Sequence, residues 1–228
     1  MSRPQADLAG LRGATDDLVL ALSAVDDDAL TGPSLLPGWT RGHVVSHLAR
    51  NADALVNVLE GHPMYSSEEA RDADIERGAA RPADEHRADV RDSGDRLADA
   101  FDALDDARWK AKVALRNGVT DHAHTLPLRR WVEVELHHLD LDIGRTVADL
   151  SGAFTDRAAD YLTARFAGHP DVPPLELRAE DGRVWHTGRE GARDIVVGTP
   201  PALVGWLSGR TSGSGLTTGG SLPALPPL

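Results

Sequence analysis

The chain has 228 residues and a net charge of −12, from 36 acidic and 24 basic side chains. An acidic chain without a cluster of lysines and arginines is a poor partner for nucleic acid or for an anionic membrane. It contains no cysteine, which excludes disulfides, thiolate metal ligands and a thiol nucleophile within the chain.

Targeting signals are not evident in the sequence. No apolar stretch approaches the roughly 20 residues that span a bilayer. The N-terminal segment MSRPQADLAG lacks the apolar core of a signal peptide. We therefore expect a cytoplasmic protein, present as a monomer or a weak homo-oligomer.

The first half of the chain predicts long amphipathic helices. Apolar side chains recur at alternating steps of three and four from Leu8 to Val25, which is the spacing of one helix face. A second helix is expected to start after Thr40, whose hydroxyl suits an N-cap, and to end at Gly61. The polar residues 61–83, which include glycine and proline, predict a long loop with at most a helical turn.

Two further helices complete a predicted bundle. One carries apolar positions from Val90 to Leu104, and the other lies in RWVEVELHHLDLDIGR, from Arg130 to Arg145. Amphipathic helices of this length bury their apolar faces against one another. Four of them predict a four-helix bundle, which we assign to residues 1–150.

After the bundle, the pattern changes to shorter elements. A helix is predicted from about Thr155 to Gly168, and two strand-like runs then flank Asp181-Gly182, a hairpin turn signal. DIVVG predicts another strand, and TPPALVGWL predicts a helix capped by Thr199. The tail SGSGLTTGGSLPALPPL predicts little regular structure. We therefore predict an α+β protein with a small α/β domain over residues 151–228.

One predicted helix carries metal-binding residue types at helical spacing. Glu133 and His137 are four residues apart, so their side chains leave one face a single turn apart. His47, beside the apolar stripe of the second helix, adds another imidazole. Two imidazoles and one carboxylate are the ligand set of a catalytic zinc site with an open fourth position. Asp140 follows His137 by three residues and could hold its free ring N–H.

These residues also have simpler interpretations. The carboxylate and imidazole of the predicted helix fit a solvated stripe beside its apolar face. A lone histidine such as His47 fits a core residue whose hydrogen bonds are satisfied, and Asp140 fits a solvated charge. Glu135 and His138 point away from the face that carries Glu133, so we expect them at the surface or behind the ligands.

The residues then point to a family. The stretches LLPGWTRGHVVSHLARNADALVNVLEG, RWVEVELHHLDLDIG and the late WLSGR with its LPALPP tail resemble the mycothiol-dependent maleylpyruvate isomerase family. The resemblance spans nearly the whole chain and implies a DinB-like four-helix bundle in its N-terminal part. It implies zinc bound by His47, Glu133 and His137, with His47 thereby also part of the catalytic centre. An arginine that assists catalysis in the family matches Arg210.

Arg210 also has a simpler interpretation. An arginine near the C-terminus of a helix interacts favourably with the helix dipole, so Arg210 fits a cation that only caps the last helix. In the role implied by the resemblance, its guanidinium would instead clamp a substrate carboxylate and stabilise enolate charge.

The resemblance implies a zinc- and mycothiol-dependent isomerase that converts maleylpyruvate to fumarylpyruvate in gentisate-type aromatic degradation. An imported thiol suits a chain without cysteine. The thiolate adds to the activated double bond, the resulting single bond rotates, and elimination releases the isomer and the thiol. Zinc would keep the thiol ionised near neutral pH.

Two other functions fit the same residues. A mycothiol S-transferase would use the same ligands but release the thiol conjugate of an electrophile intact, in detoxification or biosynthesis. A non-catalytic zinc-binding bundle would bind or sense a partner. Thiol-dependent isomerisation, stable conjugate formation and the absence of both distinguish the three functions.

Overall fold

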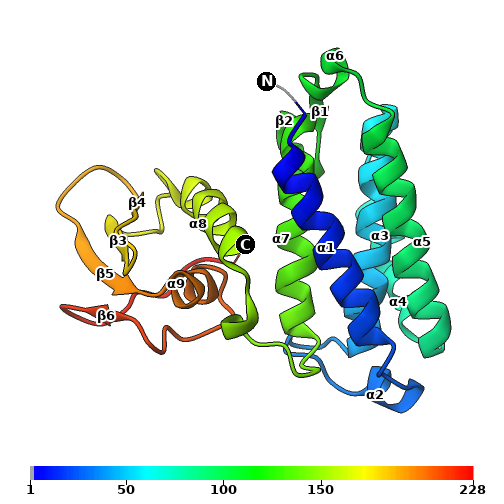
Figure 1. Ribbon diagram of the computed structural model, residues 1–228, viewed down its shortest axis with the longest axis horizontal. Coiled ribbons are helices and arrows are strands. Elements are labelled where there is room, and N and C mark those ends of the chain that lie inside the picture. Colours follow the sequence, from blue (N-terminus) through cyan, green and yellow to red (C-terminus); the bar gives the residue numbers. More distant parts are fainter. Residues whose placement is uncertain (1–2, 228) are drawn as a thin grey trace. The chain divides into compact units, whose positions relative to one another are not determined.

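The computed structural model describes residues 3–227, which divide into two compact units. The first unit extends through Ile143, and the second begins at Gly144. Helices dominate the first unit, whereas the second combines helices with a small sheet (Figure 1). The predicted α+β class is therefore confirmed.

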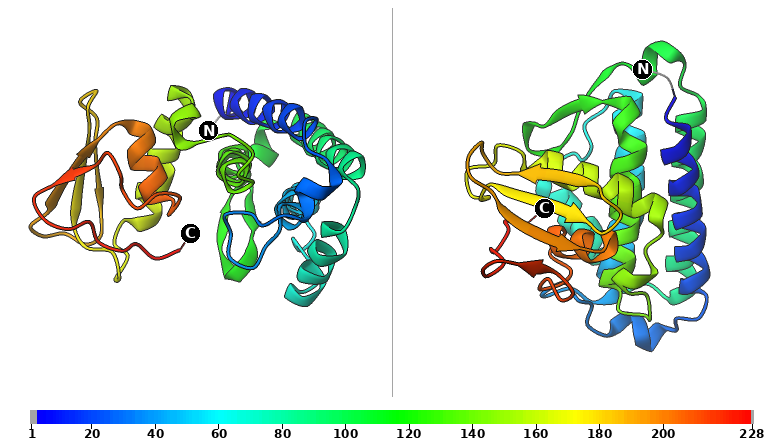
Figure 2. Two further views of the ribbon diagram at one scale, coloured as in Figure 1. Left: turned by 90° about the horizontal axis from the view of Figure 1, so that it is seen from below. Right: turned by 60° about the vertical axis from the view of Figure 1, so that its left-hand side comes forward.

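The N-terminal unit is a bundle of four long helices, which are α1 (Gln5–Leu22), α3 (Arg41–Glu60), α5 (Ala83–Asp102) and α7 (Leu126–Asp140). Helices α1 and α3 each pack against both α5 and α7, so the four close around one core (Figure 2). Leu18, Leu48, Leu97 and Val134, one from each helix, are fully buried there. The apolar stripes predicted from the sequence form this core.

Shorter elements join the bundle helices. They are α2 (Asp27–Thr31), α4 (Glu68–Ala79), α6 (Asp106–Trp109), strands β1 (Lys112–Ala114) and β2 (Thr120–His122), and the 3-10 helices η1 (Arg116–Gly118) and η2 (Ala123–Thr125). Strands β1 and β2 pair antiparallel. The connection between them turns at Asn117 and Gly118, which both have positive φ. The sequence analysis did not predict this hairpin.

The segment after α3 is a helix and not the predicted loop. Helix α4 has 12 residues, begins at the N-cap Ser67 and packs along α3. The two helices approach closely because each contributes a glycine. A Cβ on Gly42 of α3 would collide with the carbonyl oxygen of Ala79, and one on Gly78 of α4 would collide with Ser46. The backbone of α4 is thus held directly against α3.

Helix α7 ends earlier than its apolar pattern predicted. It stops at Asp140, and Asp142 adopts a left-handed φ of 52°. Arg41, at the first position of α3, donates from Nε to the carbonyl of Leu141 at 2.6 Å. This bond satisfies a carbonyl that the helix leaves free and ties the end of α7 to the start of α3.

The C-terminal unit packs two helices on a mixed sheet. Helix α8 (Gly152–Phe166) contacts α9 (Pro200–Leu207), and the 3-10 helix η3 (Val147–Asp149) also packs on α9. The sheet has the order β4-β3-β5-β6, with strands β3 (Leu175–Ala179), β4 (Val184–Thr187), β5 (Asp194–Gly198) and β6 (Thr217–Thr218). Helix α8 contacts β4, and α9 contacts β3 and β5, so both cover one face of the sheet (Figure 2).

The hairpin and the capped helix predicted for this unit are confirmed, and one further strand is present in addition. Strands β3 and β4 form the predicted hairpin, in which Gly182 has a φ of 92°. Thr199 caps α9 by accepting from the backbone N–H of Ala202. The addition is β6, which forms in the tail and pairs antiparallel with β5. Within the described residues, no helix has the length and apolar character that crossing a bilayer requires.

The close α3–α4 contact predicts a stability effect. Gly42→Ala should lower the free energy of unfolding by about 1–3 kcal/mol, because the added methyl group must push the backbone of α4 away. Gly13→Ala is the matched control, since Gly13 lies in α1 with open space around it, and there alanine should be neutral or stabilising by up to about 1 kcal/mol. Urea unfolding measures both. Equal stability of the two variants would contradict the packing argument.

Candidate metal centre

The three predicted ligands meet inside the bundle. His47 comes from α3, and Glu133 and His137 come from α7. One ligand atom from each lies within 4.8 Å of the others. Nε2 of His47 is 3.2 Å and Nε2 of His137 is 3.3 Å from the same Oε2 of Glu133. Three polar groups from two helices therefore converge on one point.

Local sequence explains how α3 presents His47. The Thr40 hydroxyl accepts from the backbone N–H of His43, and the His43 ring in turn accepts from the backbone N–H of Thr40. This capping box fixes where α3 begins. Trp39, just before the cap, lies against the rings of both His43 and His47. The start of α3 thus sets the position of the His47 ring.

Asp140 has the supporting position that the sequence predicted. Its Oδ2 lies 2.8 Å from Nδ1 of His137, and its side chain is only 2% exposed. A carboxylate in this position holds the imidazole in one orientation and keeps the proton on Nδ1. Nε2 of His137 is then directed at Glu133, as a metal ligand must be.

The pKa values of the cluster are strongly shifted. Burial lowers the pKa of His47 to about 4, which favours the neutral imidazole that binds metals. Burial opposes the charged forms of Glu133 and His137 as well, but their mutual hydrogen bond and those with neighbouring residues outweigh it. The pKa of Glu133 is therefore lowered well below its usual value, and that of His137 is raised with the help of Asp140.

The cluster fits a divalent metal ion. Two imidazole nitrogens and one carboxylate oxygen match the protein ligands of catalytic zinc, which keeps a fourth position for water or substrate. The Glu133 side chain remains 40% exposed, so the cluster is accessible from one side. A charged carboxylate and a neutral His47 are the forms that coordination needs.

Two residues near the cluster were missed by the sequence analysis. Arg71 of α4 places Nη2 3.4 Å from Nδ1 of His47, and its guanidinium lies over the ring of Tyr65 at 5.9 Å. Burial raises the pKa of Tyr65. The signal that could have found Arg71 is the start of α4, where Ser67 precedes two glutamates in the pattern of a helix N-terminus.

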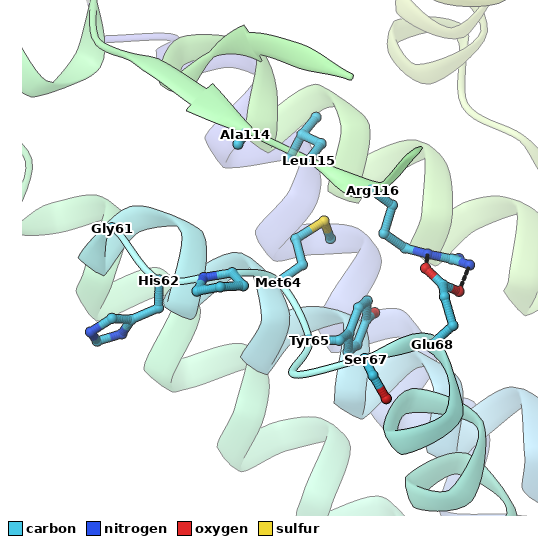
Figure 3. Close-up of a pocket in the computed structure, with 10 residues that line it drawn as sticks. Gly61, His62, Met64, Tyr65, Ser67, Glu68, Ala114, Leu115 and Arg116 are labelled. Carbon is cyan, nitrogen blue, oxygen red and sulfur yellow. Dashed lines mark hydrogen bonds and ion pairs between the residues drawn. The ribbon is translucent and has the colours of Figure 1, made fainter. Parts of the chain in front are cut away.

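A cavity of about 520 Å³ adjoins these residues. It lies between the segment that follows α3 (residues 61–65, 67 and 68) and residues 114–116 (Figure 3). Arg116 and Glu68 form an ion pair at its edge. Tyr65 lines the cavity and lies under Arg71, which in turn contacts His47. The cavity is thus linked to the cluster of His47, Glu133 and His137 through two side chains.

The remaining residues singled out from the sequence occupy other places. Glu135 and His138 are buried, at 4% exposure each, and so neither is a surface residue. Trp131 donates to Glu135 from its ring nitrogen at 3.4 Å. Arg210 follows α9 in the C-terminal unit, where its Nη1 donates to the carbonyl of Ser208 at 2.7 Å. Its role in catalysis stays a prediction.

Comparison with known proteins identifies the family. The model of the mycothiol maleylpyruvate isomerase N-terminal domain matches residues 11–142. The chain belongs to this family. The C-terminal domain model of the mycothiol maleylpyruvate isomerase family matches residues 149–227, so the resemblance inferred from the sequence is confirmed. No protein with a curated description matches the chain significantly.

Solved structures of the mycothiol maleylpyruvate isomerase family are also similar. The crystal structure of the mycothiol-dependent maleylpyruvate isomerase is 28% identical, with a TM-score of 0.89 and complete coverage of both chains. A mutant of that enzyme, in which alanine replaces one histidine, is 27% identical with a TM-score of 0.88 and the same coverage. The likeness therefore extends over both units.

The contact between Asp140 and His137 predicts a titration effect. In the metal-free protein, Asp140→Asn should lower the pKa of His137, because the amide can still accept from Nδ1–H but no longer stabilises the imidazolium. NMR titration of the histidine ring signals measures the change. The matched control is Asp142→Asn, since Asp142 is exposed two residues later. An unchanged pKa in Asp140→Asn would contradict the assigned contact.

Proposed function

We propose that this protein is a zinc- and mycothiol-dependent isomerase that converts maleylpyruvate to fumarylpyruvate. The observation that carries the proposal is the cluster of His47, Glu133 and His137 in a chain of this family. Likeness to a mycothiol-dependent maleylpyruvate isomerase over the full length of both chains supports it. We assign the cluster to a bundle domain, residues 1–150, with residues 151–228 as the second domain.

Each residue of the cluster has a distinct task in this proposal. Zinc held by His47, Glu133 and His137 would lower the pKa of the mycothiol thiol, so that a thiolate is present near neutral pH. Asp140 orients the ring of His137 and keeps its proton on Nδ1. Glu133 supplies the negative charge that makes binding of a divalent cation favourable. The chain has no cysteine, so the sulfur must come from the added thiol.

The acidic chain is suited to small-molecule partners. A net charge of −12 disfavours contact with nucleic acid and with anionic lipid. We propose that a small electrophile and a low-molecular-weight thiol are its reactants, that it acts in the cytoplasm, and that it is a monomer or a weak homo-oligomer.

The first test measures zinc content and isomerase activity in the same protein samples. The purified protein should hold about one zinc per chain and convert maleylpyruvate to fumarylpyruvate only when a thiol such as mycothiol is added. His47→Ala, Glu133→Ala and His137→Ala should each lose metal, measured by elemental analysis, and lose isomerisation, measured by absorbance.

Asp140→Asn should weaken zinc binding by about 10- to 100-fold, because it leaves the ligands in place but loosens His137.

The outcomes separate the candidate functions. A stable thiol conjugate without isomerisation would indicate the S-transferase, and zinc binding without reaction with any thiol would indicate a non-catalytic bundle. Turnover with thiol rigorously omitted would contradict the proposed mechanism. His138→Ala is the control for general loss of packing, since His138 is buried on α7 outside the cluster.

A second test concerns Arg210. Arg210→Ala should keep zinc and fold but lower kcat by about 10²- to 10³-fold, because it removes charge stabilisation that grows as the enolate forms. Arg210→Lys should recover only part, since a point charge cannot replace a bidentate contact. Arg165→Ala, at an exposed arginine in the last turn of α8, is the control. Near-normal turnover of Arg210→Ala would leave Arg210 as a helix-terminal cation only.

A further inference from the structure

Two of the hydrogen-bond donors of Arg71, Nε and Nη2, are poorly satisfied by acceptors among residues 3–227. Its Nη1 donates to Asp72 at 2.6 Å, its Nη2 lies 3.4 Å from Nδ1 of His47, and its guanidinium also interacts with the Tyr65 side chain. Its Nε is buried and has no hydrogen-bond partner among residues 3–227. Nη2 therefore lies beside the cluster of His47, Glu133 and His137, and Nε, on the same guanidinium edge, has no acceptor among the described residues.

In other arginines of the chain, the Nε and Nη2 edge of the guanidinium binds a carboxylate. In Arg96, Arg116 and Arg129, Nε and Nη2 donate together to a single carboxylate. Such paired donation matches the geometry of a carboxylate and is stronger than a contact between neutral groups. Arg71 has the same edge, but its own acidic neighbour Asp72 binds the other nitrogen.

A bound metal ion would free the edge further. Nε2 of His47 faces Glu133, so Nε2 is the nitrogen that would coordinate the ion. A neutral imidazole that coordinates through Nε2 carries its proton on Nδ1. Nδ1–H is a donor, and so it cannot accept from Nη2 of Arg71. With metal present, Nη2 would lose Nδ1 of His47 as an acceptor, and Nε has none among the described residues, so this edge is available to an acceptor from outside the chain.

Charge favours an anion as that acceptor. The carboxylates of Glu133 and Asp140 would offset the charge of a divalent ion at the cluster. Arg130, another nearby cation, is 2% exposed and donates to Asn51, so it is shielded from a ligand, and Arg116 at the cavity edge is paired with Glu68. The Arg71 side chain retains 12% exposure, and Tyr65 supports its guanidinium from the cavity side.

We propose that the Nε and Nη2 edge of Arg71 binds a carboxylate of the substrate beside the metal, which makes Arg71 a specificity-determining residue for dianionic substrates. This inference rests on the proposed function, because it takes the reactant to be a dicarboxylate. It differs from the role assigned to Arg210, since Arg71 belongs to the unit that holds the metal ligands. The other carboxylate of the substrate is left to a different group.

A binding experiment without thiol tests the inference directly. The probe is maleate, the unreactive dicarboxylate that resembles one half of maleylpyruvate, and its monoamide maleamate is the comparison. Isothermal titration of the zinc-loaded protein should give tighter binding of maleate than of maleamate. Arg71→Gln should weaken maleate binding by about 10- to 100-fold, the range expected when a charge-assisted hydrogen-bonded contact is lost. Its effect on maleamate should be smaller.

Matched variants separate recognition from packing. Arg77→Gln removes an exposed arginine of the same helix, 70% exposed, and should leave maleate binding unchanged. Arg71→Lys should keep part of the affinity, because it retains the charge but not the paired donors. Zinc content and melting temperature should stay near wild type in all three variants. Nε–H of Arg71, observed by nitrogen-detected NMR, should shift on addition of maleate.

Results for maleate binding, zinc content or folding that differ from these expectations would overturn the inference. Maleate binding that is absent in the wild type, or equal in the wild type and Arg71→Gln, would exclude a carboxylate contact with Arg71. Loss of zinc or of fold in both Arg71→Gln and Arg71→Lys would make Arg71 a support for His47 only. Failure of the proposed function is distinct, because it would appear as absent isomerisation while Arg71-dependent maleate binding persists.

Discussion

The contact between His47 and Glu133 across the bundle is the interaction on which the site depends. It joins α3 to α7 over 86 positions of sequence. A carboxylate placed among packed helices is costly unless opposite charge or hydrogen bonds compensate it. Two imidazoles provide that compensation for Glu133, and Asp140 in turn supports one of them. The polar groups of the cluster are therefore mutually dependent, and removal of one changes the protonation of the rest.

The backbone around this contact is fixed at several points. A capping box begins α3 about two turns before His47, and Arg41 ties the start of α3 to the end of α7. Gly42 and Gly78 let α4 lie directly on α3, and α4 carries Arg71 to the imidazole. Small side chains at helix contacts are usually explained by packing alone. Here the same close approach also places the Arg71 guanidinium beside His47.

Some of this arrangement follows from local sequence, and some does not. The Thr40 cap, the end of α3 at Gly61 and the i, i+4 pairing of Glu133 with His137 depend on neighbouring residues, so spacing alone predicted them correctly. Helix α4 buries only Ile75 and Gly78, and because it lacks an apolar stripe its sequence predicts a loop. Its stability comes from contact with α3, which no window of sequence contains.

The other differences have similar causes. The β1–β2 hairpin turns at Asn117-Gly118, a dipeptide typical of such turns that was not among the predicted elements. Strand β6 has two residues and exists only because β5 offers a free edge. That Glu135 and His138 are buried could not be read from α7, because the helix is enclosed on more faces than its pattern suggests. The supporting role of Asp140 was predictable, since it lies within one turn of His137.

The electrostatics of the site explain why an acidic protein can bind an acidic substrate. The net charge of −12 is a property of the whole surface, and at physiological salt its field is screened beyond about 8 Å. Within the cluster, by contrast, His47 and His137 are largely buried, and each fixed charge acts more strongly there than in water. The charge of a divalent ion there would be offset by Glu133 and Asp140. The positive charge left for a ligand would then belong to the guanidinium groups nearest the ion, so the proposed selectivity for dianions would depend on where those groups point and not on their number.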